Sequence, residues 1–386
     1  MNHISEREEE LPEAVIGKLM KIASEDKSIA SVGPGEPDFP LPKPLINEIK
    51  RVASNCNHYS SPAGRTDLRE AIVKKLKKEN KIEVEPENVI VACGSQEALL
   101  LASMATLDVG EQVVLPSPCF MGYLPMFELI DAQVVPVELK EESNYQLNPD
   151  DLKKAIDKKK TKVLMLNSPS NPTGTVMKKK ILEEVADIAI ENDLLIFSDE
   201  AYEKIVYDAK HISIGSLNGM KKHVVTFQSF SKSYAMCGFR VGYAVANEEL
   251  AKAMSKVHTY SSLTAPTISQ LLAIKALSLP RKYTDNMVKE YRTRRDFIVK
   301  RLNEMGLSTP MPQGAFYTFS NIENYSKDSY KFASNLLKQK VAVVPGIEFG
   351  ASGEGHIRCS YATKLDTIKI AMDRLEKHLQ KQAWKQ

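Results

Sequence analysis

The chain is poor in the features that mark membrane-spanning, secreted and zinc-binding proteins. No apolar run in its 386 residues approaches the roughly 18 residues that a membrane-spanning helix needs. The first residues, Met1–Glu10, are acidic and contain no apolar core of a signal peptide. The 5 cysteines stand at scattered positions without a Cys-x-x-Cys pair, which argues against a disulfide framework and a zinc site. We therefore expect a cytoplasmic protein that binds no metal.

A strong excess of one charge is missing as well. The 52 lysines and arginines face 49 aspartates and glutamates, giving a formal net charge of +3. This near-balance gives no reason to expect a nucleic acid or a membrane surface as a partner. The lysine clusters Lys74–Lys78, Lys158–Lys160 and Lys178–Lys180 stand near acidic residues, so we expect them on solvated helix faces and caps.

Between about Asn88 and Ala246, apolar runs alternate with helical patterns. Several runs are rich in valine, isoleucine and leucine without polar alternation, as in strands of a sheet covered on both faces. The pattern predicts an α/β fold with a mostly parallel central sheet between helices. The predicted strands are Val89–Ala92, Gln112–Leu115, Gln133–Val137, Lys162–Leu166, Leu194–Phe197, His223–Phe230 and Val241–Val245, and the predicted helices are Gln96–Leu107, Pro125–Ile130 and Lys179–Asn192.

The pattern changes after Pro280. A long charged helix is predicted over Arg281–Met305, and Gly306 would end it as a C-cap. Shorter strands and helices follow, which predicts a smaller α+β domain of residues 1–41 and 281–386 beside a large domain of residues 42–280. The later predicted strands are Ala315–Phe319, Val341–Val344 and His356–Ser360, and the later predicted helices are Tyr330–Lys338 and Lys364–Gln380.

One short segment combines an amine with groups that suit a phosphate. Lys232 closes the run Ser229-Phe230-Ser231-Lys232 at the end of a predicted strand, and Arg240 follows shortly after. A lysine in such a place can lose its proton more easily and attack a carbonyl. The two serine hydroxyls and the Arg240 guanidinium can bind one phosphate. A single lysine is far more often a solvated surface charge, so Lys232 needs support from the rest of the chain.

Three other predicted strands end in polar residues of a matching kind. Ligands of open α/β sheets bind outside the carboxyl ends of the strands. The segment Cys93–Gln96 opens a helix whose free N–H groups suit a phosphate, although Ser95 could be an ordinary helix cap. Asn171 stands in a rigid turn of Asn167–Gly174, where Asn171-Pro172 is a plausible cis bond. Asp199 could pair with a protonated ring nitrogen, or could simply cap a helix.

Together these residues are the parts needed to hold pyridoxal phosphate. The chain resembles the class I/II aminotransferases, which are fold-type I pyridoxal-phosphate enzymes, in particular the aspartate and aromatic aminotransferases of archaea and bacteria. The resemblance covers almost the whole length. The matching stretches are Gly35–Phe39, Tyr59 with Gly64 and Leu68–Ala71, Asn171–Gly174, Asp199–Tyr202, Ser229–Lys232, Gly238–Gly242, Gly314–Tyr317, Val344–Gly346 and Ile357–Ala362.

The resemblance implies a role for each of these site residues. Lys232 would form a Schiff base with pyridoxal 5'-phosphate and move a proton, Asp199 would keep the ring nitrogen protonated, and Tyr202 and Asn171 would bond the ring hydroxyl. Arg358 would bind the substrate α-carboxylate, with the Gly35 N–H nearby. Phe120 would stack on the ring, and the phosphate would meet Gly94, Ser95, Gln96, Ser229, Ser231 and Arg240, with Tyr59 reaching in from the second subunit of a homodimer.

Other functions remain open at this point. A nicotinamide-dependent dehydrogenase is disfavoured, because Asp38 replaces the third glycine of the Gly33-Pro34-Gly35 segment and Pro37 prevents a helix there. A regulator would need an added DNA-binding domain, and the chain before Gly35 is too short for one. A C–S lyase or synthase is the main alternative, since the same cofactor serves many bond cleavages.

The substrate is the least determined feature. Gln96 stands where some aspartate-selective relatives have a basic residue, and Phe120, Tyr123 and Tyr260 suit an apolar or aromatic side chain. Arg65 could instead meet an acidic side chain from the partner subunit. We expect an aminotransferase with a ping-pong mechanism, a broad donor range with aromatic amino acids ahead of aspartate, and 2-oxoglutarate as the acceptor.

Overall fold

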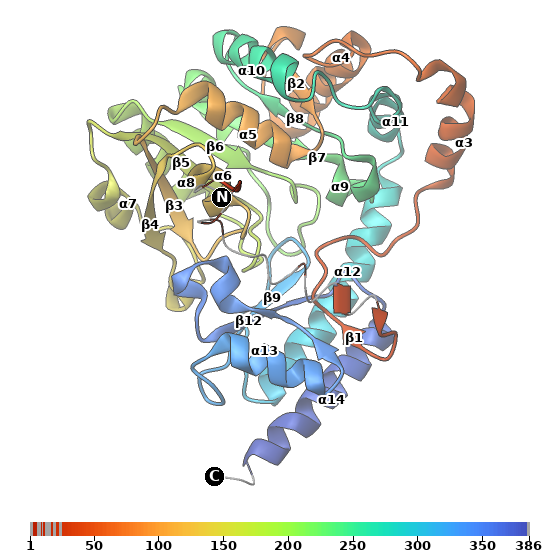
Figure 1. Ribbon diagram of the computed structural model, residues 1–386, viewed down its shortest axis with the longest axis vertical. Coiled ribbons are helices and arrows are strands. Elements are labelled where there is room, and N and C mark those ends of the chain that lie inside the picture. Colours follow the sequence, from red (N-terminus) through yellow and green to blue (C-terminus); the bar gives the residue numbers. More distant parts are fainter. Residues whose placement is uncertain are drawn as a thin grey trace.

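The computed structural model describes residues 3–5, 9, 11, 17, 21–22 and 25–383. Its central feature is a seven-stranded sheet with the strand order β2-β8-β7-β6-β5-β3-β4 (Figure 1). β8 pairs antiparallel with both of its neighbours, whereas the other pairs are parallel. The strands are β2 (Val89–Ala92), β3 (Gln112–Ser117), β4 (Gln133–Glu138), β5 (Thr161–Asn167), β6 (Leu195–Asp199), β7 (Val224–Ser229) and β8 (Gly242–Val245).

The predicted α/β fold with a mostly parallel sheet is thereby confirmed. Side chains of a strand point alternately to opposite faces, and in β5 the residues Val163 and Met165 pack in one hydrophobic cluster while Leu164 and Leu166 pack in another. Every residue of β2, β7 and β8 is buried. Burial on both faces explains why β2 and β8 show continuous apolar runs rather than polar alternation, whereas β7 also buries the polar residues Thr226 and Gln228.

Helices cover both faces of this sheet. α5 and α10 pack on one face, and α8 packs on the other. The Asn148 side chain accepts a hydrogen bond from the Asp150 N–H, and the Asn247 side chain accepts one from the Leu250 N–H. These caps satisfy free N–H groups at the starts of α7 and α10. The helices before residue 282 are α3 (Lys43–Val52), α4 (Thr66–Lys75), α5 (Ser95–Thr106), α6 (Tyr123–Glu128), α7 (Pro149–Ala155), α8 (Lys179–Glu191), α9 (Phe230–Ser233), α10 (Glu248–Ser261) and α11 (Thr267–Leu277).

A second, smaller part contains an antiparallel sheet of order β11-β12-β9 and a two-stranded parallel pair of β1 with β10. Its own hydrophobic cluster includes Val32, Tyr291 and Phe316. α12 ends just before Gly306, whose φ of 79° suits the predicted C-cap. The elements are β1 (Ala30–Ser31), α12 (Lys282–Glu304), β9 (Tyr317–Asn321), α13 (Ser329–Lys338), β10 (Val341–Ala342), β11 (Val344–Pro345), β12 (His356–Ser360) and α14 (Leu365–Ala383).

Two predictions about local structure are wrong. The strand expected at Val341–Val344 is two strands in different sheets, because Ala342 pairs with Ser31 whereas Val344 pairs with Arg358. Lys75 does not lie on a solvated face: its side chain is 6% exposed and forms an ion pair with Glu203. The domain limits at residues 41/42 and 280/281 stay a prediction.

The strand ends that bear the predicted site residues lie at one edge of the large sheet. In the parallel register, Asn167 at the end of β5 stands beside Asp199 at the end of β6, and Asp199 stands beside Phe227 near the end of β7. The smaller sheet lies opposite this edge (Figure 1). No helix in the described part of the chain is both long and apolar enough to cross a bilayer.

Candidate active site

A cleft of about 700 Å³ lies at the carboxyl ends of these strands. It brings together all of the predicted site residues except Tyr59. Residues of both parts of the molecule line it, since Arg358 comes from β12 and Lys232 from α9. The predicted residues in its lining are Gly35, Gly94, Ser95, Gln96, Phe120, Asn171, Asp199, Tyr202, Ser229, Ser231, Lys232, Arg240 and Arg358.

Lys232 lies in the short helix α9, directly after β7. Ser229, the last residue of β7, caps this helix, and its hydroxyl accepts a hydrogen bond of 3.2 Å from the Ser231 N–H. The Lys232 ammonium donates to the backbone carbonyl of Gly35 over 2.6 Å. One neutral carbonyl is a modest partner for an amine, so the Lys232 Nζ is held at the cleft and stays available to a ligand.

The start of α5 and the Arg240 guanidinium form an anion-binding corner. Gly94 precedes the first helical residue, Ser95, and no side chain caps the free N–H groups there, so Ser95 is not the ordinary helix cap that was the alternative. Arg240 donates from Nη2 to the Cys93 carbonyl over 3.3 Å and from Nη1 to the Cys237 carbonyl over 3.0 Å. A Cβ at Gly94 would lie 2.9 Å from Arg240 Nη2 and one at Gly242 would lie 2.5 Å from the Ser95 nitrogen, so both glycines keep this corner open.

Asp199 presents a half-buried carboxylate to the cleft. Its Oδ2 accepts a hydrogen bond of 2.8 Å from the Tyr123 hydroxyl, and its Oδ1 accepts one of 3.0 Å from the Ala201 N–H. Burial raises the pKa of this carboxyl above its usual range despite both hydrogen bonds. A carboxylate in this state is stabilised by a protonated or cationic group beside it. Tyr123 was expected only as a lining residue, and its link to Asp199 was missed.

A pair of tyrosines stands beside Asp199. The hydroxyls of Tyr202 and Tyr317 lie 2.8 Å apart, and both side chains are buried. Tyr317 also limits the space at Gly35, where a Cβ would lie 2.4 Å from the Tyr317 oxygen. The motif Gly314–Tyr317 drew attention in the sequence, but no role was given to Tyr317.

Asn171 connects the strand ends to the smaller sheet. Its N–H donates to Asn167 Oδ1 over 2.8 Å, and its Oδ1 accepts from Arg358 Nη1 over 2.9 Å. The Asn171-Pro172 bond is cis, as the sequence indicated. Asn171 thereby holds the Arg358 guanidinium against the edge of the large sheet.

Arg358 is a buried cation, only 2% exposed. Its Nη2 donates to the Gly33 carbonyl over 2.7 Å, and the guanidinium stacks on the Tyr317 and Phe349 rings at 4.4 and 4.9 Å from their centroids. Its Nε has no hydrogen-bond partner, and within the described residues no carboxylate pairs with it. Burial lowers the pKa of this group. A buried cation without a countercharge is costly, so this position favours an anionic ligand.

Three predicted contributors lie outside the cleft lining. The Tyr59 side chain is 84% exposed, and so is that of Tyr260. The Tyr59 loop is fixed by hydrogen bonds from Thr264 Oγ1 to the Ser61 carbonyl (2.9 Å) and from Thr267 Oγ1 to the His58 carbonyl (2.8 Å). Arg65 forms an ion pair of 2.7 Å with Asp67. Within a single chain these residues do not complete the cleft.

Comparison with known proteins places this cleft in a family. A family model for aminotransferase class I and II matches residues 29–375. An aspartate aminotransferase of Pyrococcus abyssi is 45% identical over 370 residues, covering 94% of this chain and 95% of the relative. The aromatic-amino-acid aminotransferase 2 of Thermococcus litoralis is 41% identical over 382 residues, covering 97% and 98%.

A solved structure agrees with these relatives. The crystal structure of an aromatic aminotransferase from Pyrococcus horikoshii OT3 has a TM-score of 0.90 at 42% sequence identity, and the match covers 94% of this chain and 99% of that one. The relatives are named as aminotransferases, which does not favour the lyase, synthase or regulator alternatives. The chain is therefore an enzyme and belongs to the class I and II aminotransferases.

Proposed function

We propose that the cleft holds pyridoxal 5'-phosphate and transfers an amino group from an α-amino acid to a 2-oxo acid. When bound, this cofactor supplies an aldehyde that condenses with amines and a protonated ring that accepts electrons. The cleft offers a complementary set of groups. Lys232 provides an amine, Asp199 a carboxylate in need of a positive neighbour, and the Arg240 corner a set of free donors for a phosphate.

The residues take their roles from their chemistry. Lys232 would supply the amine that reacts with the cofactor aldehyde and would move the proton at the substrate α-carbon. Asp199, oriented by Tyr123, would keep the ring nitrogen protonated, while Tyr202 and Asn171 would hold the ring hydroxyl and Phe120 would pack against the ring. The phosphate binds at Gly94, Ser95, Gln96, Ser229, Ser231 and Arg240.

The observation that carries this proposal is the buried Arg358 guanidinium in the same cleft as Lys232. An amino acid and a 2-oxo acid share an α-carboxylate, so both can bind to Arg358 in turn. That alternation is the basis of a ping-pong mechanism, with 2-oxoglutarate as the acceptor. The Gly35 N–H would lie next to the same carboxylate.

The side-chain preference follows from the residues that line the cleft. Apolar and aromatic residues line it, among them Leu99, Phe120 and Leu129. The cations among its described lining residues are Lys232, Arg240 and Arg358, and each already has a role in this proposal. A second carboxylate would therefore lack a countercharge within one chain. We accordingly propose aromatic amino acids ahead of aspartate as donors.

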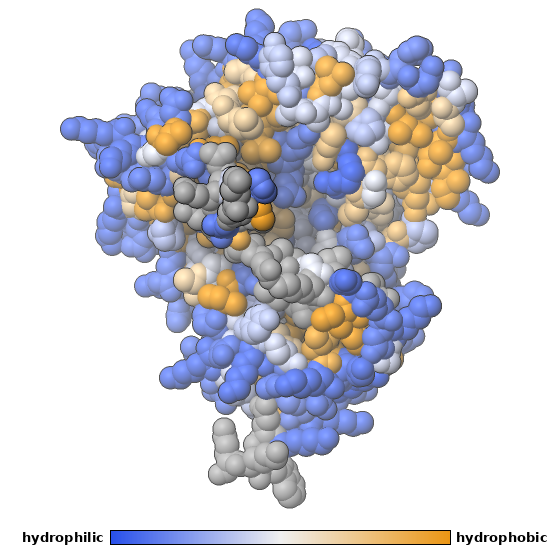
Figure 2. All heavy atoms as spheres, viewed as in Figure 1, coloured by the Kyte–Doolittle hydropathy of each residue, from blue (hydrophilic) through white to orange (hydrophobic). Residues whose placement is uncertain are grey.

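A homodimer with shared sites completes the proposal. The Tyr59 side chain is 84% exposed, and hydrogen bonds fix its loop, so it could contact the phosphate bound to a neighbouring subunit. Hydrophobic residues also gather on the surface over α3, where Ile46 is 41% exposed (Figure 2). The 5 free cysteines suit a reducing cytoplasm.

Subunit mixing tests the shared sites. Tyr59→Ala and Lys232→Ala proteins are each expected to be nearly inactive. A mixed dimer has one site with both residues and one site with neither, so activity should partly return on mixing. If subunits exchange, as shown by differently tagged chains, and activity stays absent, sharing of Tyr59 is refuted.

A donor panel tests the proposed reaction. Protein loaded with pyridoxal phosphate is given tyrosine, phenylalanine or aspartate together with 2-oxoglutarate, and glutamate formation is measured. We expect a higher kcat/KM for the aromatic donors. A kcat/KM for aspartate more than about tenfold higher, or about 1.4 kcal/mol in the barrier, would reverse the proposed preference. Absence of glutamate with every donor would refute the reaction itself.

A further inference from the structure

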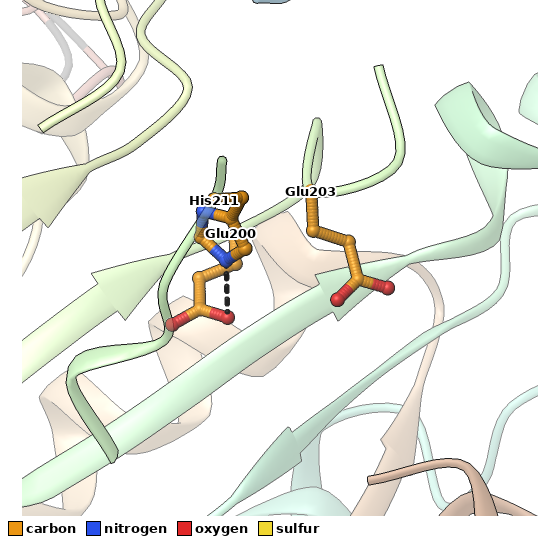
Figure 3. A group of neighbouring side chains, drawn as sticks. All are labelled: Glu200, Glu203 and His211. Atoms are coloured by element: carbon orange, nitrogen blue, oxygen red, sulfur yellow. Dashed lines mark hydrogen bonds and ion pairs between the residues drawn. The ribbon is translucent and has the colours of Figure 1, made fainter. Parts of the chain in front are cut away.

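Directly behind Asp199, a second group of charged side chains is closed off from the cleft. Glu200, only 1% exposed, lies next to His211 and Glu203 (Figure 3), and none of these three residues lines the cleft as Asp199 does. Glu200 Oε1 accepts from the hydroxyls of Ser198 (3.0 Å) and Ser213 (2.6 Å). Its Oε2 lies 3.1 Å from His211 Nε2.

Glu203 is equally well supplied with donors. Lys75 forms an ion pair with it, and Asn80 donates to its Oε2 over 2.6 Å. The Lys75 ammonium also donates to Asn80 Oδ1 over 2.8 Å. Burial by itself would raise the pKa of Glu203, yet Lys75, Lys204 and the hydrogen bonds lower it to about 2. The carboxylate is therefore ionised and held in place.

Glu200, Glu203 and His211 have the composition of a metal site, with ligand atoms within 4.8 Å of one another. The Lys75 ammonium, however, already lies against Glu203 and supplies the positive charge. Serine, asparagine and glutamine donors occupy the remaining positions on both carboxylates. The group is an internal ion-pair network, and a metal ion would have to displace its lysine.

Gln228 joins the two carboxylates. Its Nε2 donates to Glu203 Oε2 over 2.9 Å and to Glu200 Oε2 over 3.3 Å. Gln228 lies on β7 immediately before Ser229, and the two glutamates lie in the segment that follows Asp199, the last residue of β6, and that also carries Tyr202. One buried amide thus connects the strand end that leads to Lys232 with the turn that begins at Asp199.

A second contact joins the same two segments. Lys204, next to Glu203, donates to the Tyr234 hydroxyl over 2.8 Å, and Tyr234 lies two residues after Lys232. The backbones are joined as well, since the Glu200 N–H donates to the Phe227 carbonyl over 2.9 Å. The side chains of Glu200, Glu203 and Gln228 therefore continue the contact between these two segments past the end of β6.

We propose that Gln228, Glu200 and Glu203 form a clamp that positions Asp199 relative to Lys232. These are positioning residues, which act through the two cleft residues without touching a ligand. The inference rests on the proposed function of the cleft. Catalytic groups must be held to within a fraction of an ångström, and residues behind them supply that restraint.

The variant Gln228→Leu tests the clamp, because leucine is of similar size but donates no hydrogen bond. Thr226→Val is the matched control, since Thr226 lies two residues earlier on β7 and is 1% exposed, against 3% for Gln228. Both variants are measured for pyridoxal-phosphate affinity of the cofactor-free protein, thermal unfolding, kcat and KM.

We expect Gln228→Leu to weaken cofactor binding and to lower kcat per bound cofactor by about tenfold each, in the range that small misplacements cost. The KM for the amino acid should change much less, because Arg358 lies on another element. Thr226→Val should stay within about twofold of the wild type. If Gln228→Leu lowers the unfolding temperature but leaves affinity and kcat per bound cofactor like those of Thr226→Val, the residue is only structural and the clamp is refuted.

Ser213→Ala provides a second test if Gln228→Leu does not fold. It removes one donor from Glu200 Oε1 and leaves all charges in place. We expect a smaller loss, about twofold to fivefold in cofactor affinity and in kcat; unchanged values for both would overturn the proposal. The wild-type protein is the reference for both variants. If the wild type does not bind pyridoxal phosphate, the proposed function itself is contradicted. If the wild type binds it and the variants are unaffected, only the clamp is contradicted.

Discussion

Asp199 and Glu200 are neighbours in the chain, yet their surroundings differ in kind. Glu200 receives hydrogen bonds from side chains on both oxygens and is closed off from solvent. Asp199 receives one side-chain and one backbone hydrogen bond, and burial raises the pKa of its carboxyl. Glu200 therefore has a full set of hydrogen-bond partners within the chain, whereas Asp199, which faces the cleft, has an incomplete set.

The two buried cations show the same contrast. Lys75 has Glu203 as a countercharge, whereas Arg358 has carbonyl and amide oxygens, aromatic faces and an Nε without a partner. Groups whose partners are complete hold the fold, and groups with an incomplete set of partners are where a ligand is stabilised. Removing a charge behind the turn should therefore lower the stability of the fold in addition to any effect on the positioning of Asp199, whereas removing a charge in the cleft should affect activity and leave stability unchanged.

The largest effect is expected for Glu203→Gln, which removes the buried countercharge of the Lys75 ammonium and leaves only the more exposed Glu79 carboxylate, 4.0 Å away. Breaking a buried ion pair in this way costs about 3–5 kcal/mol of the free energy of unfolding. Denaturant unfolding of the cofactor-free protein measures it. Glu183→Gln is the control, because the Lys179–Glu183 pair is exposed and should contribute less than about 1 kcal/mol. If both substitutions lower the free energy of unfolding by the same amount, the buried charges behind the turn do not hold the fold as this comparison requires.

The same variant carries a pH signature. The pKa of Glu203 is about 2 in the folded protein and lies below the ordinary glutamate value of 4.5. A lowered folded-state pKa adds stability above the unfolded pKa, and this part is lost as the pH falls from about 4.5 towards 2. Wild-type stability should therefore fall more steeply across this window than that of Glu203→Gln; parallel curves would show that Glu203 is not the titrating group.

The next effect concerns Asp199→Ala. Pyridoxal phosphate should still bind, but the rate should fall about 10²–10³-fold, or about 3–4 kcal/mol in the barrier. The cofactor-free protein should unfold at no lower denaturant concentration than the wild type, because a carboxyl with a raised pKa does not stabilise the fold at neutral pH. Near-normal turnover would mean that Asp199 only organises its turn through the Ala201 N–H.

A smaller loss is expected for Arg358→Leu. Without the guanidinium the α-carboxylate loses its main partner, and kcat/KM should fall by about 2–3 kcal/mol. Removing a buried cation that has no countercharge should not destabilise the cofactor-free protein. Arg358→Lys keeps the positive charge but cannot form the bidentate contact of a guanidinium with a carboxylate, so its kcat/KM should lie between those of the wild type and Arg358→Leu. Large destabilisation without a change in kcat/KM would place Arg358 with the structural charges.

The smallest effect is expected for Arg65→Ala. The Arg65–Asp67 pair has side-chain exposures of 34% and 50%, and such pairs contribute about 0.2–1 kcal/mol. Activity with tyrosine should change by less than about twofold. A selective loss of activity with aspartate would instead show that Arg65 meets an acidic substrate side chain from the partner subunit.

The sequence was most informative where one pattern repeats along the chain. Most strands of the large sheet contain continuous apolar runs, and their predicted limits lie within a few residues of the observed ones. The helices α3, α4, α7, α9, α10 and α11 were not predicted. α11 is apolar around much of its surface because it packs in one cluster with α3 and α4, so it lacks a clear polar face.

Contacts between distant residues explain the other gaps. Lys75 pairs with a glutamate 128 positions away, and Tyr123 bonds to an aspartate 76 positions away. Neither separation leaves a local pattern, so Lys75 was expected in solvent and the Tyr123 hydroxyl bond was missed. The site residues of short motifs, such as Asp199 and Lys232, could be found because each motif follows a predicted strand.

The most direct test is borohydride reduction of the protein after incubation with pyridoxal phosphate, followed by mass spectrometry of its peptides. A Schiff base at Lys232 is expected to leave a reduced pyridoxyl group on the peptide that contains Ser229–Lys232, and Lys232→Ala should carry none. A stable modification on a different lysine, or its persistence in Lys232→Ala, would contradict the assignment of this cleft.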